Sequence, residues 1–194
     1  ELCKVLADLK NAGHQIILVS SGAIGMGVGK LSLSKRPDDI PTKQAAAAVG
    51  QCELMYTYDK LFAEHNHTVA QILLTGDDTE EADRAAHLRS TFSALLEMGV
   101  IPVVNENDSV SSEEIQFGGN DTLSAYVGIA SEADLVINLS DIDGLYNKDP
   151  RKYEDAVLID RVECINDEIK SYAGGAGSSR GTGGMITKIN AAEI

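Results

Sequence analysis

Apolar residues along this chain fall into short continuous runs separated by amphipathic stretches. The runs are IILV, VAQILL, VIPVV and DLVINL, at residues 16–19, 69–74, 100–104 and 134–139. None of them alternates with polar residues, so each is typical of a strand in a parallel sheet that is covered on both faces. The stretches between them predict helices over about 43–64, 80–98 and 122–130.

The two ends of the chain read as helices. ELCKVLADLK at the N-terminus is amphipathic, with Leu2, Val5, Leu6 and Leu9 on one stripe that Gly13 ends. KINAAEI at the C-terminus is also typical of a helix.

Helix and strand therefore follow one another four times. This order implies right-handed crossovers and predicts an α/β fold, a three-layer α/β/α sandwich with a mainly parallel central sheet. We expect a single domain over 1–194, because no linker or repeat is visible and a chain of 194 residues buries a sizeable core. Ligands of such sheets bind beyond the C-terminal ends of the strands, so functional residues are expected directly after the apolar runs.

The first glycine-rich segment is SSGAIGMGVGK, at residues 20–30. It has neither the GxGxxG spacing of dinucleotide-binding folds nor the GxxxxGK[ST] spacing of P-loops. What remains is SSG at a strand end that opens a helix. Backbone N–H groups there, with the hydroxyls of Ser20 and Ser21, can hold an anionic oxygen. A plain tight turn explains the same residues.

The second glycine-rich segment is GTGGMITK, at residues 181–188. Its glycines allow close approach of the backbone to a phosphate, Thr182 and Thr187 add hydroxyls, and Lys188 adds a positive charge. A glycine loop with a solvated lysine is the alternative that this segment alone leaves open.

Two polar segments follow the third apolar run: NENDSV at residues 105–110 and GGNDTLSA at residues 118–125. Asn and Asp at a helix start are good N-caps, which would explain either segment alone. Together they favour a pocket for a small polar molecule, in which carboxylates bind an amino group and amides bind a carboxylate.

Charge and cysteine usage narrow the possible partners. The net charge of −14 argues against nucleic acid and anionic membranes, which attract basic surfaces. No apolar run approaches the roughly 20 residues of a membrane span, and no signal peptide is visible. The three cysteines are odd in number and far apart, which predicts reduced thiols in a cytoplasmic protein. The cysteines and histidines lack metal-ligand spacing, so no metal site is expected from them.

The ordered set SSGAIGMG, KQAAAAVGQ, QILLT, PVVNENDSV, FGGNDTLSA, LSDIDGLY and GTGGMITK resembles the amino-acid kinase family. The resemblance covers essentially the whole chain. NENDSV together with GTGGMITK points to the members that phosphorylate glutamate, rather than aspartate, acetylglutamate, carbamate or uridylate. It implies transfer of a phosphoryl group from ATP, with Mg²⁺, to the side-chain carboxylate of L-glutamate. The product, glutamyl 5-phosphate, would enter proline biosynthesis.

The resemblance also implies roles for single residues. Asp108 would bind the α-amino group of glutamate, with Asn105 and Asn120 near its α-carboxylate, and Ser21 is a further glutamate-binding position. Gly22 would contact the transferred phosphoryl group through its N–H, Lys188 would neutralise the charge on that group, and Asp121 would orient the lysine. The nucleotide-binding positions would be Ser140, Asp141, Thr182, Gly183, Gly184, Met185, Ile186, Thr187 and Lys188.

Family members begin with a strand of the type VVKxGS, whereas this chain begins at the following helix. We therefore expect residues 1–194 to lack the first strand and the C-terminal strands of the domain, and alone to be poorly soluble and inactive. The helix that contains KQAAAAVGQCELM is expected to mediate homo-oligomer formation, because its small residues allow close helix approach. Proline as feedback inhibitor and glutamyl phosphate reductase as pathway partner are further implications.

Two alternatives stand beside a glutamate kinase. The first is a non-catalytic amino-acid or nucleotide sensor on the same fold, and the second is another carboxylate kinase of the family. The presence of Lys188, Asp121 and both glycine-rich segments favours an enzyme.

Overall fold

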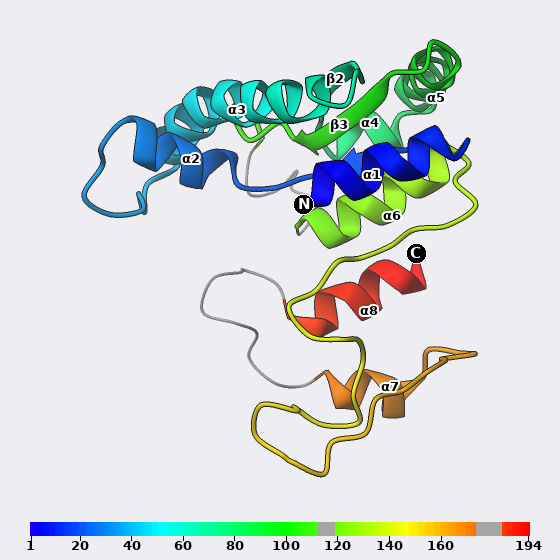
Figure 1. The fold of residues 1–194 in the computed structure, drawn as a ribbon. Coiled ribbons are helices and arrows are strands. Elements are labelled where there is room, and N and C mark those ends of the chain that lie inside the picture. Colours follow the sequence, from blue (N-terminus) through cyan, green and yellow to red (C-terminus); the bar gives the residue numbers. More distant parts are fainter. Residues whose placement is uncertain (112–118, 174–183) are drawn as a thin grey trace. The chain divides into compact units, whose positions relative to one another are not determined.

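The computed structural model describes residues 1–111, 119–173 and 184–194 (Figure 1). Contacts within the chain define two compact units, Glu1–Asn120 and Asp121–Ile194. The first unit contains the β-sheet and the second is built around short helices. The single domain over 1–194 stays a prediction.

The elements of the first unit alternate as the apolar pattern predicts. They are α1 (Leu2–Asn11), β1 (Leu18–Val19), α2 (Ala23–Lys30), α3 (Ile40–Ala63), β2 (Val69–Leu74), α4 (Asp77–Glu80), α5 (Ala82–Glu97) and β3 (Ile101–Glu106). Helix α6 (Asn120–Ala130) begins at the last residue of this unit and continues in the second, which also contains α7 (Asp167–Tyr172) and α8 (Met185–Glu193). The short helices α4 and α7 were not predicted from the sequence.

The sheet has the order β1-β3-β2, and both pairings are parallel. Strand β3 is central, and all six of its residues are buried. Burial of every residue along a strand requires cover on both faces, which explains the apolar run at residues 101–104. The α/β class, with a parallel sheet and helices on both of its sides, is confirmed (Figure 1).

The core of the first unit joins α1 and α3 to the sheet. Cys3, Phe62 and Ile101 form a buried cluster, and Leu6 and Leu18 pack against it. The buried positions of α1 are Cys3 and Ala7, whereas Leu2, Val5 and Leu9 are exposed. The predicted helix is confirmed, but its buried positions are Cys3 and Ala7, and of the predicted apolar stripe only Leu6 packs against the core.

Close contact between α2 and α3 accounts for the small residues of KQAAAAVGQ. A Cβ atom on Gly27 would lie 1.8 Å from the Ala46 carbonyl oxygen, and one on Gly50 would lie 1.7 Å from that of Ala23. The two helices can approach this closely only because both positions are glycine. The small residues taken to favour self-association thus serve packing within the chain, and the homo-oligomer stays a prediction.

The predicted fourth strand, at 134–139, is wrong in this structure. These residues form no strand, and Leu135, Ile137 and Leu139 are 72%, 68% and 65% exposed. A strand exists only when it pairs with another strand. The described residues of the second unit provide no such partner, and their one bridge joins Tyr146 to Leu158.

Candidate active site

The end of β1 leads into α2 through Ser20, Ser21 and Gly22. The Ser20 N–H donates to the Val104 carbonyl (2.9 Å), and its hydroxyl lies 2.7 Å from that of Tyr58. Gly22 is the N-cap of α2 with φ +107°, a conformation that favours glycine. No side chain caps this helix, so its first N–H groups, beside the exposed Ser21, can meet an anion.

Side-chain amides at the end of β3 form a connected set of hydrogen bonds. Nδ2 of Asn105 donates to Oε1 of Gln51 (3.0 Å), and Oδ1 of Asn105 accepts from Nδ2 of Asn120 (3.2 Å). Nδ2 of Asn120 also donates to the carbonyl oxygen of Ser20. The structure thus brings Asn105 and Asn120 together with the end of β1, and Asn105 is only 3% exposed.

Asp108 follows β3 in a half-buried position. Burial raises the pKa of its carboxyl group above the ordinary value, and the positive charge of Arg36 opposes this rise. Among the described residues no donor is hydrogen-bonded to this carboxylate. A cationic ligand such as an ammonium group would stabilise the negative charge of a carboxylate that has lost part of its hydration.

Buried polar contacts hold the segment that carries Asp108. The Ser111 hydroxyl donates to Oε1 of Glu106 (2.9 Å), and Nε2 of Gln44 donates to the Ser111 carbonyl (3.2 Å). The Asn107 N–H donates to the Leu74 carbonyl at the end of β2 (2.8 Å). The ends of β2 and β3 are therefore connected directly.

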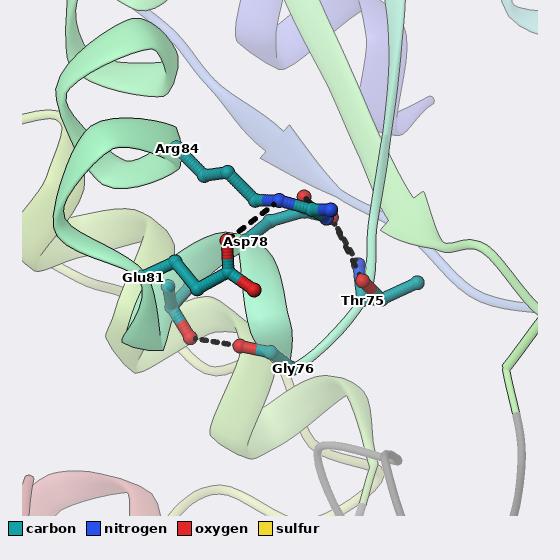
Figure 2. A network of polar contacts seen from close by, with 6 residues as sticks. Thr75, Gly76, Asp78, Glu81 and Arg84 are labelled. Carbon is teal, nitrogen blue, oxygen red and sulfur yellow. Dashed lines mark hydrogen bonds and ion pairs between the residues drawn. The ribbon is translucent and has the colours of Figure 1, made fainter.

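A polar network orders the turn after β2 (Figure 2). Oδ2 of Asp78 accepts from the N–H and the hydroxyl of Thr75 (2.8 and 2.9 Å), and its Oδ1 accepts from Arg84 (3.1 Å). Arg84 also pairs with Glu81 (3.1 Å). Burial alone would raise the pKa of Asp78, but these hydrogen bonds and the Arg84 charge together lower it.

The second unit contains a separate charged cluster. Nζ of Lys188 on α8 lies 2.7 Å from Oδ1 of Asp121 on α6. The Thr187 hydroxyl is 2.6 Å from Oδ2 of the same carboxylate. Both charged side chains are 22% exposed, so the pair is shielded from water yet accessible. Sequence neighbours on α8 thus hold both oxygens of Asp121.

The remaining predicted nucleotide-binding positions lie before or at the start of α8 or in the segment after α6. Ser140 and Asp141 are exposed, and Asp141 pairs with Arg151 (2.6 Å). Gly184 is the N-cap of α8, followed by the half-buried Met185 and Ile186. Thr182 and Gly183 lie outside the described residues.

Sequence reasoning missed the supporting residues Gln51, Tyr58, Thr75 and Asp78. The T-x-x-D spacing of Thr75 and Asp78 after an apolar run is a local signal of a capped turn and was available in the sequence. Gln51 and Tyr58 lie inside a helix without a distinguishing pattern, so only the packing of α3 on the sheet shows their partners.

A model of the amino acid kinase family matches residues 1–194, and the chain belongs to this family. The resemblance found in the sequence is thereby confirmed. Three relatives are proteins named glutamate 5-kinase. The one from Clostridium acetobutylicum is 59% identical over 193 residues, which cover 100% of this chain and 72% of the relative.

The other two relatives extend the comparison. The protein from Clostridium perfringens is 54% identical, with 100% of this chain and 74% of the relative covered. The protein from Carboxydothermus hydrogenoformans is 57% identical, with 97% of this chain and 50% of the relative covered. The chain therefore spans about three quarters of some relatives and half of others. In addition, none of the helices among the described residues is long and apolar enough to cross a membrane.

Proposed function

We propose that this chain carries the active site of an ATP-dependent glutamate 5-kinase. The observation that carries the proposal is 59% identity over the whole chain to a protein of that name. The Asp121–Lys188 pair supports it, because phosphoryl transfer needs a fixed cation beside the transferred group. No observation favours a non-catalytic sensor.

The reaction forms one bond and breaks another. A side-chain carboxylate oxygen of glutamate bonds to the γ-phosphorus of ATP, while the bond from that phosphorus to the bridging oxygen breaks and ADP leaves. The carboxylate is already ionised at neutral pH, so no general base is required. The protein must position two anions and neutralise charge as it spreads over the phosphoryl oxygens.

Lys188 is the residue that supplies this charge. Its partner Asp121 accepts from Nζ through Oδ1, and the Thr187 hydroxyl lies at hydrogen-bond distance from Oδ2, so Nζ has a defined position before substrate binds. Rigid donors stabilise a transition state without reorganising during the reaction. In the first unit, the Gly22 N–H and the first N–H groups of α2, which no side chain caps, are donors for an anionic oxygen.

Mg²⁺ is the metal that accompanies ATP in kinases. Among the described residues no group of three or more His, Cys, Asp or Glu side chains is placed to hold a metal. Mg²⁺ is commonly bound by one or two carboxylates together with substrate phosphates and water. Bound together with the nucleotide, Mg²⁺ would supply charge neutralisation at the phosphates.

Glutamate binding is assigned to Asp108, Asn120 and Ser21. The half-buried Asp108 carboxylate pairs with the α-ammonium group. This ion pair compensates for the hydration that the carboxylate loses on burial. The exposed Ser21 hydroxyl and the N–H groups beside it are donors for a substrate carboxylate. Asn105 is nearly fully buried, so its contribution is support for Asn120.

The whole protein has further proposed partners. Its product is an acyl phosphate, which a glutamyl phosphate reductase consumes in proline biosynthesis, and proline is the expected feedback inhibitor. A cytoplasmic location and a homo-oligomer belong to the same proposal.

The decisive experiment measures ADP formation by the whole protein with ATP, Mg²⁺ and L-glutamate. Hydroxylamine is added to trap the acyl phosphate as a hydroxamate, which distinguishes transfer to glutamate from hydrolysis of ATP. Aspartate, N-acetylglutamate, carbamate and UMP replace glutamate in parallel assays. Equal or greater turnover with one of these would overturn the proposed substrate, and ADP formation independent of any acceptor would overturn the kinase.

A further inference from the structure

Side-chain amides between β3, α3 and α6 form a chain of hydrogen bonds with a fixed direction. The Glu106 N–H, which can only donate, lies 2.9 Å from Oδ1 of Asn105. The carbonyl of Ser20, which can only accept, receives Nδ2 of Asn120. Because backbone groups cannot exchange donor and acceptor, they determine which way both asparagine amides face.

The orientation of Asn105 requires a matching acceptor. With Oδ1 facing the Glu106 N–H, its Nδ2 faces Oε1 of Gln51 at 3.0 Å. Gln51 is 8% exposed, and its own Nε2 donates to Oε1 of the exposed Gln71 at 3.1 Å. Gln51 therefore provides the acceptor that the buried amide of Asn105 needs. Its own amide nitrogen donates to Gln71 at the surface.

In this chain of hydrogen bonds, the amide nitrogen of Asn120 is used and its amide oxygen, Oδ1, is left. Its Nδ2 donates to the Ser20 carbonyl and to Oδ1 of Asn105, and an amide nitrogen has only two hydrogens. Among the described residues no donor reaches Oδ1 of Asn120. That oxygen is an acceptor, so it suits an ammonium group, which donates, better than a carboxylate, which also accepts.

We propose that Gln51 is a positioning residue for glutamate, which through Asn105 holds Asn120 so that its Oδ1 accepts from the substrate α-ammonium group. The inference rests on the proposed function. It shifts Asn120 from the α-carboxylate of glutamate, where the family resemblance places it, to the α-amino group. Gln51 itself touches no substrate.

Two substitutions at Gln51 separate positioning from space-filling. Gln51→Met keeps the length but removes the acceptor for Asn105, whereas Gln51→Glu keeps an acceptor and adds a buried charge. A positioning role predicts that Gln51→Met raises the KM for glutamate about tenfold or more, with the KM for ATP nearly unchanged, and that Gln51→Glu is closer to wild type. A space-filling role predicts the opposite order, and that order would overturn the proposal.

Gln71→Met is the matched control. Gln71 is the exposed end of the chain, so water replaces it as a partner of Gln51, and the KM for glutamate should stay within about twofold of wild type. If Gln51→Met fails to fold while Gln51→Glu folds with a normal KM, the need for an acceptor is supported. If wild type shows no glutamate-dependent turnover, the proposed function fails. If wild type is active and Gln51→Met behaves like Gln71→Met, only the present inference fails.

A measurement on the unmutated protein decides the remaining case, in which neither Gln51 variant folds. In isotope-labelled protein the Nδ2 protons of Asn120 should exchange slowly with solvent, because both are hydrogen-bonded. Their resonances should move when glutamate is added, and much less with glutarate, which has two carboxylates but no amino group. Fast exchange, or equal movement with both compounds, would overturn the proposal.

Discussion

Nζ of Lys188 and Oδ1 of Asp121 lie 2.7 Å apart, in a pair whose second carboxylate oxygen is held by Thr187. The lysine therefore has a fixed position without any substrate. We expect Lys188→Ala to lower kcat by on the order of 10²–10³-fold, the range for loss of one donor that stabilises transition-state charge. Steady-state kinetics of the whole protein measure this effect.

Lys170→Ala is the matched control for Lys188→Ala. Lys170 also pairs with a carboxylate of α8, that of Glu193 at 2.7 Å, but this pair lies at the surface. Its loss should leave kcat within about twofold, since exposed pairs contribute little. A Lys188→Ala enzyme within a few-fold of wild type, or an equal loss in both variants, would remove Lys188 from the mechanism.

Asp108→Asn should raise the KM for glutamate far more than the KM for ATP. The substitution keeps the size of the side chain but removes the negative charge that pairs with the α-ammonium group. Charge-assisted hydrogen bonds are roughly twice as strong as neutral ones, so about tenfold or more is expected in the glutamate KM. Equal effects on both substrates would show that Asp108 is structural.

The same substitution should stabilise the free protein at neutral pH. Burial raises the folded-state pKa of Asp108, so its contribution to stability is complete below the ordinary pKa of aspartate and is lost as pH rises through the raised value. The free energy of unfolding of Asp108→Asn should therefore increase relative to wild type as pH rises. Chemical denaturation at several pH values tests this, with Asp59→Asn, at an exposed position of α3, controlling for the loss of one negative charge. A pH-independent difference for Asp108→Asn would contradict the prediction.

The sequence predicted those strands of the sheet that a local run of apolar residues marks. The runs 69–74 and 100–104 became β2 and most of β3, and β3 is buried at every position. The run 134–139 is also mostly apolar but has no pairing partner among the described residues of its unit. Apolar composition thus reports the tendency to form a strand, whereas pairing depends on other parts of the chain.

The candidate site shows the same division. Lys188 and Asp121 stand out in the sequence because a glycine-rich segment and an N-D pair accompany them, and the structure places them in contact. Gln51 could not be found this way. It is one of several polar residues in α3, and its importance depends on facing Asn105, which is distant in the sequence.

Asp78→Ala should destabilise the protein by about 1–2 kcal/mol, because a carboxylate that accepts from the N–H and the hydroxyl of Thr75 is removed. The hydrogen bonds from Thr75 and Arg84 lower the folded pKa of Asp78 despite its burial (Figure 2). Its contribution is therefore present above the ordinary pKa of aspartate and is lost as pH falls through the lowered value. Denaturation of wild type and variant from neutral to acid pH should show the two stabilities converging.

Arg84→Ala provides the comparison for Asp78→Ala. Arg84 is 51% exposed, so its loss should cost clearly less than the loss of Asp78. An Arg84→Ala variant that is as unstable as Asp78→Ala would mean that the ion pair, rather than the capped turn, stabilises the segment after β2.

The contact between α2 and α3 predicts that a glycine-to-alanine substitution has opposite effects on stability at two positions of α2. In Gly27→Ala the new methyl group would overlap the Ala46 carbonyl oxygen, at 1.8 Å, and backbone atoms cannot move aside without separating the helices. We expect a loss of about 1–3 kcal/mol or more, as for overpacked cores.

In Gly29→Ala the methyl group meets nothing within 4 Å. Alanine favours a helix over glycine by up to about 1 kcal/mol, so this variant should be as stable as wild type or more so. Urea unfolding of the two variants side by side measures the difference, and a Gly27→Ala protein as stable as Gly29→Ala would show that α2 and α3 do not pack this closely.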